Sequence, residues 1–255
     1  MIIGKLHPGS GLGNQLHTYV MTRVRACALS CEFSFVGKEF FKGNSLFQID
    51  WGKDNDLTYH IEQPAGKLIV DSPHTLWEEK TEYYNPEINF VEDGTVIDGY
   101  FQDERYFEHM IPSIREWLKT EPLEMDDTLI VINFRGGEFK YVPELYLTEE
   151  YWDEALDLMI ERMKKKYQTC RVEVHTDDST AAVQMFPEFV VYQDLAYNWR
   201  SIRYAKHLIL SNSSFAILPA LLNENADIIA PRYFARRNTK TWWLPQNYYK
   251  RFLYI

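Results

Sequence analysis

The chain has 255 residues, of which 45% are hydrophobic and 25% charged, as in an ordinary folded globular protein. This composition excludes an intrinsically disordered chain, a collagen-like repeat and a disulfide-rich scaffold. The net charge of −10, from 37 acidic and 27 basic residues, disfavours nucleic acid as a partner because its phosphate groups would be repelled.

No apolar run in the sequence approaches the roughly 20 residues of a membrane-spanning helix, and the first residues lack the apolar segment of a signal peptide. We therefore expect a cytoplasmic protein. The three cysteines, Cys27, Cys31 and Cys170, are an odd and sparse set that indicates reduced structural thiols. Cys27 and Cys31 are four residues apart on a predicted helix, so we expect them to share one of its faces.

The first half of the chain opens with an apolar strand, a glycine-rich turn and a helix whose apolar residues recur at helical spacing. This order is typical of an α/β domain. Beyond it the pattern is weaker, and polar loops are expected between the elements. The predicted strands are residues 2–6, 32–36, 67–70 and 95–98, and the predicted helices are residues 14–29 and 103–118.

Residues 119–127 are acidic, contain a proline and are the best candidate for a linker. We therefore predict an N-terminal α/β domain at residues 1–119 and a C-terminal domain at residues 120–255. In the latter, strands and helices alternate regularly, which indicates a Rossmann-like parallel sheet with helices on both faces. The predicted strands are residues 128–134, 171–176, 189–192, 207–210 and 227–230, and the helices are residues 148–166 (capped by Thr148), 179–186, 196–206 and 213–223.

Residues that directly follow these strands are candidate site residues, because open parallel sheets bind ligands at the carboxyl ends of their strands. Three groups in the C-terminal domain meet this condition, and a glycine loop follows the first strand of the chain. The candidates are Arg135, Gly136, Gly137 and Glu138; Asp177 and Asp178; Ser211, Asn212, Ser213, Ser214 and Phe215; and Gly9, Ser10, Gly11, Leu12, Gly13 and Asn14.

These residue types suit a nucleoside diphosphate. Arg135 can clamp phosphate oxygens with its bidentate fork, and the glycine pair after it would let the backbone approach the ligand closely. Ser213 and Ser214 open a helix whose N-terminus attracts anions. The carboxylate of Asp177 or Asp178 matches the two adjacent N–H donors of guanine.

Structural alternatives stay open for each group. Ser213 can act as a plain N-cap, which is compatible with anion binding. The aspartate pair can cap a helix, and Arg135 can be a structural ion-pair residue. The glycine loop is weak evidence by itself, because it lacks the Lys-Ser ending of a P-loop.

Other chemistries are disfavoured. Asp54 and Asp56 resemble an Asp-x-Asp metal motif but lie in a polar loop, and the histidines show no metal-ligand spacing with the cysteines. We therefore expect no metal and no cofactor. The basic residues 232–240, followed by Trp242 and Trp243, indicate a solvated face over core tryptophans, with contact to an anionic or lipid-linked acceptor as the alternative.

Several segments resemble glycosyltransferase family 11, the α-1,2-fucosyltransferases of the wider fucosyltransferase superfamily. The similarity runs in the same order along nearly the whole chain. It is carried by Gly-Leu-Gly-Asn-Gln-Leu at residues 11–16, Gly-Tyr-Phe-Gln-Asp at residues 99–103 with Arg105, Tyr106 and Phe107, Asn-Phe-Arg-Gly-Gly-Glu-Phe at residues 133–139, Ser-Asn-Ser-Ser-Phe at residues 211–215, and Ile-Ala-Pro at residues 229–231.

The resemblance implies a GT-B-type fold, in which two Rossmann-like domains face each other across a cleft. It implies an inverting, metal-independent transfer of L-fucose from GDP-β-L-fucose to a glycan hydroxyl, with an α-1,2 linkage to a galactoside. It also implies roles: Arg135 on the β-phosphate, Asp177 and Asp178 near guanine, Ser213, Ser214 and Phe215 on phosphate and fucose, and Asn14, in the loop with Gly11 and Gly13, facing the donor.

The chain departs from the family pattern at three positions. Asn133, Gly136 and Glu138 stand where the family carries a histidine, a second arginine and an aspartate. Asn133 can still hydrogen-bond guanine, and the general base stays open between Glu138 and His17. The competing hypotheses are another GDP-sugar donor and a nucleotide-sugar-binding module without catalysis. The expected partners are a GDP-sugar and a glycan acceptor, which can be lipid-linked, with at most peripheral membrane contact.

Overall fold

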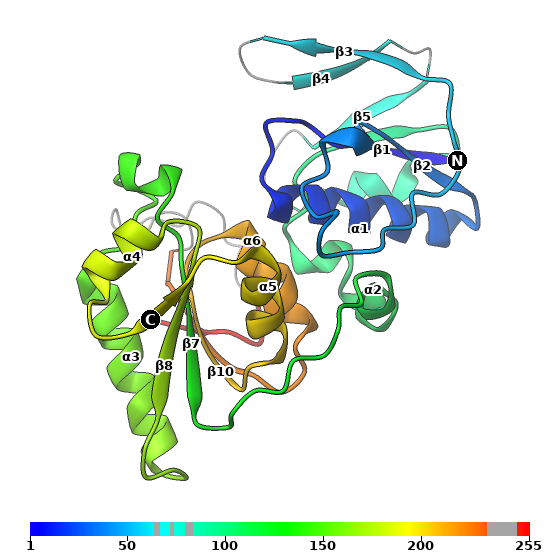
Figure 1. Cartoon of the computed structure of the whole chain (residues 1–255). Coiled ribbons are helices and arrows are strands. Elements are labelled where there is room, and N and C mark those ends of the chain that lie inside the picture. The colour runs from blue at the N-terminus through cyan, green and yellow to red at the C-terminus, as the bar shows by residue number, and fades with distance from the viewer. Residues whose placement is uncertain (64–66, 72–73, 80–83, 234–248) are drawn as a thin grey trace. The chain divides into compact units, whose positions relative to one another are not determined.

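The computed structural model describes residues 1–63, 67–71, 74–79, 84–233 and 249–255, and the chain divides into two compact units. Unit 1 is Met1–Lys119 and unit 2 is Thr120–Ile255, so the division falls at the start of the predicted linker. Each unit contains a parallel sheet with helices packed on it (Figure 1). The predicted α/β class is therefore confirmed, while the placement of two domains across a cleft stays a prediction.

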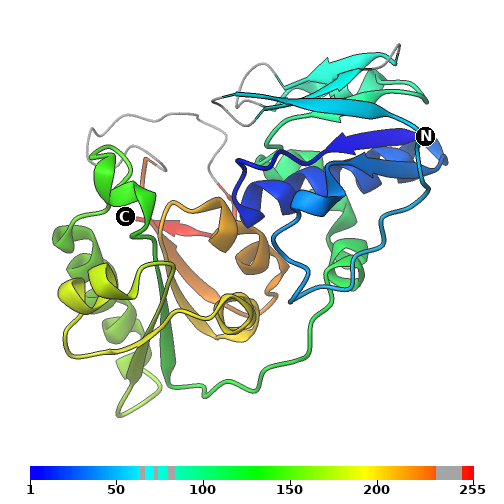
Figure 2. The same cartoon turned by 45° about the horizontal axis from the view of Figure 1, so that its top comes forward.

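Unit 1 is built on a four-stranded parallel sheet of order β2-β1-β6-β5. Helix α1 connects β1 to β2 and packs along one face of this sheet (Figures 1 and 2). β1 is buried at every residue because it has a strand on each side. The elements are β1 Ile2–Lys5, α1 Leu12–Leu29, β2 Phe33–Val36, β5 Leu76–Glu78 and β6 Val96–Asp98.

The region between β2 and β5 is more ordered than the sequence predicted. The predicted strand at residues 67–70 is β4 (Lys67–Asp71), and it pairs with an antiparallel strand, β3 (Thr58–Glu62), that was expected to be loop. Only alternate residues of β3 are half-buried, so it has no continuous apolar run. The hairpin joins the core through Leu68, which packs with Ile3, Val36 and Val96.

Two expectations for helices of unit 1 are wrong. The single helix at residues 103–118 is replaced by two 3₁₀ turns, Glu104–Tyr106 and Glu108–Met110, and by α2 (Ile111–Trp117), because Phe107 has a non-helical backbone with φ −143°. Helix α1 ends at Leu29, and Ser30 takes a left-handed conformation with φ 51°. Cys31 therefore lies beyond the helix and does not share a helical face with Cys27.

Unit 2 contains a six-stranded parallel sheet of order β12-β11-β10-β7-β8-β9. Helices α3 and α4 lie on one face and α5 and α6 on the other, which confirms the predicted alternation (Figure 1). The short β12 was not predicted. The elements are β7 Leu129–Phe134, α3 Glu149–Lys164, β8 Arg171–Thr176, α4 Ser179–Met185, β9 Val190–Tyr192, α5 Leu195–Tyr204, β10 His207–Leu210, α6 Ser214–Leu222, β11 Asp227–Ala230 and β12 Leu253–Tyr254.

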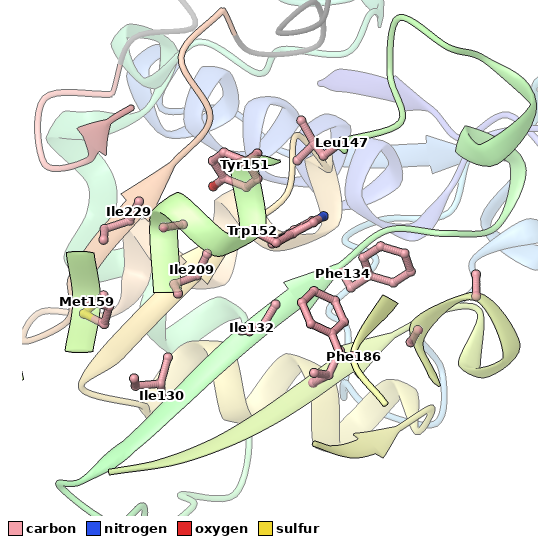
Figure 3. Close-up of a cluster of buried hydrophobic side chains, with 14 of the residues drawn as sticks. Ile130, Ile132, Phe134, Leu147, Tyr151, Trp152, Met159, Phe186, Ile209 and Ile229 are labelled. Carbon is pink, nitrogen blue, oxygen red and sulfur yellow. The ribbon is translucent and has the colours of Figure 1, made fainter. Parts of the chain in front are cut away.

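A cluster of buried aromatic and aliphatic side chains joins α3 and α4 to the sheet (Figure 3). The ring of Phe134, the last residue of β7, lies 5.7 Å from Trp152 and 5.6 Å from Phe186, measured between centroids. Tyr151 donates a buried hydrogen bond of 2.6 Å to the carbonyl of Leu210, the last residue of β10. The carboxyl ends of β7 and β10 are therefore anchored from the α3 side. Thr148 precedes α3 as expected but makes no side-chain capping bond.

Candidate functional site

The strand order of unit 2 reverses between β7 and β10. From β7 the chain adds β8 and β9 on one side, then crosses to β10 and continues outward through β11 and β12. In open α/β sheets a ligand binds in the crevice at such a switch point, outside the carboxyl ends of the strands. Arg135 follows β7 and Ser211 follows β10, so two of the predicted groups lie at this position.

Arg135 is held by two carboxylates. Its Nη1 lies 2.5 Å from Oδ2 of Asp177, and its Nη2 lies 2.5 Å from Oε1 of Glu138. The guanidinium carbon lies 5.3 Å from the centre of the Phe139 ring. The Nε atom is buried and has no hydrogen-bond partner among the described residues. Arg135 therefore forms the structural ion pairs that were left open as an alternative. One donor of its guanidinium, Nε–H, still has no partner among the described residues.

The glycine pair after Arg135 is explained by the neighbouring loop. A Cβ atom on Gly137 would lie 2.2 Å from Oδ2 of Asp177, and one on Gly136 would lie 2.8 Å from Cβ of Asp178. Gly137 also has a positive φ of 22°. We expected the glycines to make room for a ligand. Instead, the neighbouring atoms that leave no room for a side chain at these positions belong to the loop after β8.

The two aspartates of that loop have different protein partners. Oδ1 of Asp177 accepts from the Gly136 backbone N–H at 3.0 Å, and burial raises the pKa of Asp177, which Arg135 offsets only in part. Asp178 caps α4 by accepting from Ala181 N–H at 3.1 Å, which is the helix-capping role left open for the aspartate pair. Its other oxygen lies 2.7 Å from Nζ of Lys140, and this hydrogen bond lowers the pKa of Asp178. The guanine assignment stays a prediction.

Three residues that the sequence analysis missed fix this loop. Gln193 donates to the Asp177 carbonyl at 2.9 Å and accepts from Ser179 N–H at 3.1 Å. Asn198 donates to the Thr176 carbonyl at 2.9 Å, and its Oδ1 lies 3.0 Å from Nδ1 of the buried His175. Gln193 directly follows β9, so the rule that found the other candidates could have found it.

The residues after β10 join the two central strands and open α6. Ser211 donates to Oδ1 of Asn133 at 2.7 Å, and both side chains are buried. Ser213 caps α6 by accepting from Phe215 N–H at 3.3 Å, which is the N-cap role that was left open. Ser214 and Phe215 are half-buried, and the Phe215 ring packs 5.8 Å from Trp199. The first turn of α6 thus begins at the switch point.

In unit 1 two motifs that are distant in the sequence meet at the carboxyl ends of β1 and β6. Gly11 precedes α1, and Asn14 in the first turn accepts a 2.9 Å hydrogen bond from Nε2 of Gln102. Thr18 donates to the Gly99 carbonyl at 2.9 Å. Gly13 is buried, and its carbonyl lies 2.8 Å from Nδ1 of His17. This edge therefore presents the side-chain amides of Asn14 and Gln102.

His17 is not placed as a general base. Its side chain is fully buried in α1 against Phe107, and burial lowers its pKa to about 4 despite the hydrogen bond to Gly13. A general base must reach the proton that it removes. Of the two candidate bases, only Glu138 has an exposed side chain.

Unit 1 also contains buried polar groups that the sequence analysis missed. Asp98 at the end of β6 lies 2.7 Å from Nζ of Lys5 and 2.7 Å from Nε2 of His7. Although burial acts in the opposite direction, the hydrogen bonds from His7 and Lys5 lower the pKa of Asp98. Glu79 accepts from the backbone N–H groups of Tyr100 and Phe101, at 2.7 and 2.9 Å, and fixes the segment before Gln102.

Within the described ranges, no group of three or more His, Cys, Asp or Glu side chains could hold a metal ion. Asp54 is exposed and pairs with Lys38 at 3.0 Å. No described helix has the length and apolar character needed to cross a bilayer. Most of the basic segment at residues 232–240, and both Trp242 and Trp243, lie outside the described residues.

Comparison with curated proteins identifies a sequence relative of this chain. The chain matches no protein-family model. It is 27% identical over 201 residues to a galactoside 2-alpha-L-fucosyltransferase from Caenorhabditis elegans, a match that covers 69% of this chain and 50% of the relative. The chain thus matches about half the length of that curated relative. The match supports the resemblance to fucosyltransferases, while membership of family 11 stays a prediction.

Among solved structures, the chain is similar to an E. coli heptosyltransferase, WaaC with ADP, with a TM-score of 0.47 and 12% sequence identity. That alignment covers 91% of this chain and 87% of the other.

Proposed function

We propose that the chain is a glycosyltransferase that moves L-fucose from GDP-β-L-fucose to a hydroxyl of a galactoside. The observation that carries the proposal is that Arg135 follows β7 and α6 begins after the adjacent strand β10, both at the switch point of the unit 2 sheet. A guanidinium and a helix N-terminus are the two protein groups best suited to a diphosphate. The fucosyltransferase relative supports the sugar and the acceptor.

In the proposed reaction the acceptor oxygen forms a bond to the anomeric carbon while the bond from that carbon to the β-phosphate oxygen breaks. Attack from the face opposite the diphosphate inverts the configuration, so a β-linked donor gives an α-linked product. The hydroxyl proton passes to a base on the acceptor side, opposite the diphosphate. GDP leaves with the electrons of the broken bond.

Arg135 has its largest effect in the transition state of this reaction, because negative charge grows on the leaving diphosphate as the glycosidic bond breaks. A preorganised cation and helix N–H groups stabilise that charge without a divalent metal ion. Asn133 and Asp178 are the proposed guanine contacts, while Asp177 is proposed to act on the diphosphate side through Arg135. Asn14, in the loop with Gly11 and Gly13, is proposed to contact the sugar of the donor. The hydrogen bond from Gln102 would orient its side-chain amide.

The test is transfer by the purified chain. With GDP-fucose and a β-galactoside, we expect GDP release and a new α-linked fucose, detected by the anomeric coupling in the NMR spectrum of the product. GDP-mannose and UDP-galactose are the control donors. GDP binding without transfer would favour a binding module, and transfer from GDP-mannose alone would correct the sugar. A chain that binds no GDP would contradict the proposal.

A further inference from the structure

The two carboxylates on Arg135 differ in how firmly they are held. The Asp177 side chain is 28% exposed, and its second oxygen is fixed by the Gly136 N–H. The Glu138 side chain is 68% exposed and lies on the short 3₁₀ turn Glu138–Tyr141, three residues from Arg135. Exposed ion pairs contribute little free energy, so Glu138 is the easier partner to remove.

The unused donor of Arg135, Nε, belongs to the same fork as Nη2, the nitrogen that Glu138 contacts. In a guanidinium, Nε–H and one N–H of Nη2 point the same way and form a fork that matches two oxygens of a carboxylate or phosphate. Glu138 contacts Nη2, one of the two nitrogens of this fork, and Nε, the other, has no partner in the described part of the chain. A phosphate group placed there would satisfy both donors, whereas Glu138 serves one.

Building on the proposed function, we propose that Glu138 is a displaceable counter-ion of Arg135. The donor diphosphate takes its place on the Nε and Nη2 edge. Asp177 stays on Nη1 and is a positioning residue that orients the guanidinium. Like-charge repulsion between the phosphate and Glu138 favours the exchange, and the exposed turn lets the glutamate side chain turn into solvent.

The test is GDP binding by isothermal titration calorimetry, with the full chain, four single variants and two double variants. Glu138→Gln removes the competing charge, so we expect GDP to bind about two- to fivefold more tightly. Asp177→Asn keeps an acceptor for Gly136 N–H but loses the charge that holds Arg135, so binding should weaken roughly tenfold. Glu188→Gln, an exposed change of the same charge in the turn before β9, is the matched control and should change affinity by less than about twofold.

Repeating Glu138→Gln and Asp177→Asn in the Arg135→Ala background shows whether their effects on GDP affinity pass through Arg135. The alternative is that they come only from the change in net charge. If both residues act through Arg135, their effects on GDP affinity shrink to less than half in that background, and melting temperatures show whether each variant is folded. Unchanged or weaker binding by Glu138→Gln would overturn the proposal, as would tighter binding by Asp177→Asn. Wild-type protein that binds no GDP would overturn the proposed function as well, whereas normal GDP binding without these differences would overturn only the counter-ion exchange.

Discussion

The carboxyl ends of the two parallel sheets carry different chemistry. In unit 2 this edge gathers charged side chains that are partly exposed and paired with one another, around Arg135 and Asp178. In unit 1 it gathers the amides of Asn14 and Gln102, beside a charged network in which the Lys5 and Asp98 side chains are only 1% and 11% exposed. Exposed charges can exchange their partners for a ligand, whereas buried ones cannot without a large cost. The unit 2 edge is thus suited to binding and the unit 1 network to stability.

The largest expected effect is on catalysis and comes from the unit 2 edge. We expect Arg135→Ala to reduce turnover several hundredfold or more, roughly 3 to 4 kcal/mol on the transition state. Arg135→Lys should remain badly impaired because a point charge cannot reproduce the fork. GDP binding should weaken as well, and the melting temperature should stay close to that of the wild type. A variant that melts far below the wild type yet keeps near-normal specific activity would show that Arg135 is structural.

The matching change in unit 1 should act on stability. Asp98→Asn leaves the Lys5 ammonium buried without a counter-charge, so we expect the free energy of unfolding to fall by about 3 to 5 kcal/mol. Because the folded pKa of Asp98 is lowered, its contribution is present above the ordinary aspartate pKa and is lost as the pH falls through the folded value. Urea unfolding of wild type and variant at neutral and acidic pH measures both effects.

Asp54→Asn is the control for this comparison. Asp54 forms an exposed pair with Lys38, so its loss should change the free energy of unfolding by less than about 1 kcal/mol. Equal destabilisation by the two variants would remove the distinction between buried and exposed charges in unit 1.

His17 gives unit 1 a further pH dependence. Its pKa is about 4 in the folded state and 6.5 in the unfolded state, so protons bind the unfolded chain first. Between pH 6.5 and 4 the free energy of unfolding should therefore fall by about 3 kcal/mol as the pH is lowered. His17→Leu should lose this slope while the wild type keeps it. Identical pH profiles would show that His17 is accessible to protons in the folded protein.

The smallest expected effect is that of a chelator. If Arg135 and the N-terminus of α6 stabilise the negative charge on the leaving diphosphate, no metal ion is needed for that purpose. Excess EDTA should then leave turnover unchanged. Loss of activity with EDTA, and its recovery on addition of magnesium or manganese, would contradict the metal-independent mechanism.

The fold and site were predictable to different degrees. Apolar runs located the strands of unit 2 except β12, and the rule for parallel sheets placed Arg135 and Ser213 at one edge. Strand β3, and with it the pairing to the predicted β4, was missed because alternate residues of β3 are exposed and it has no continuous apolar run. Contacts such as Gln102 with Asn14, 88 residues apart, follow from the packing of whole elements, and no local spacing encodes them. The need for glycine at position 136 could not be predicted from local sequence either, because it arises from close contact with the loop after β8.

The most direct test of the account is the structure of the full chain with GDP bound. The account predicts the diphosphate at the carboxyl ends of β7 and β10, beside the first turn of α6, with phosphate oxygens on Nε and Nη2 of Arg135. Asp177 should remain on Nη1, and Glu138 should have turned away. GDP bound elsewhere, or a diphosphate held by a metal ion while Arg135 keeps both carboxylates, would contradict it.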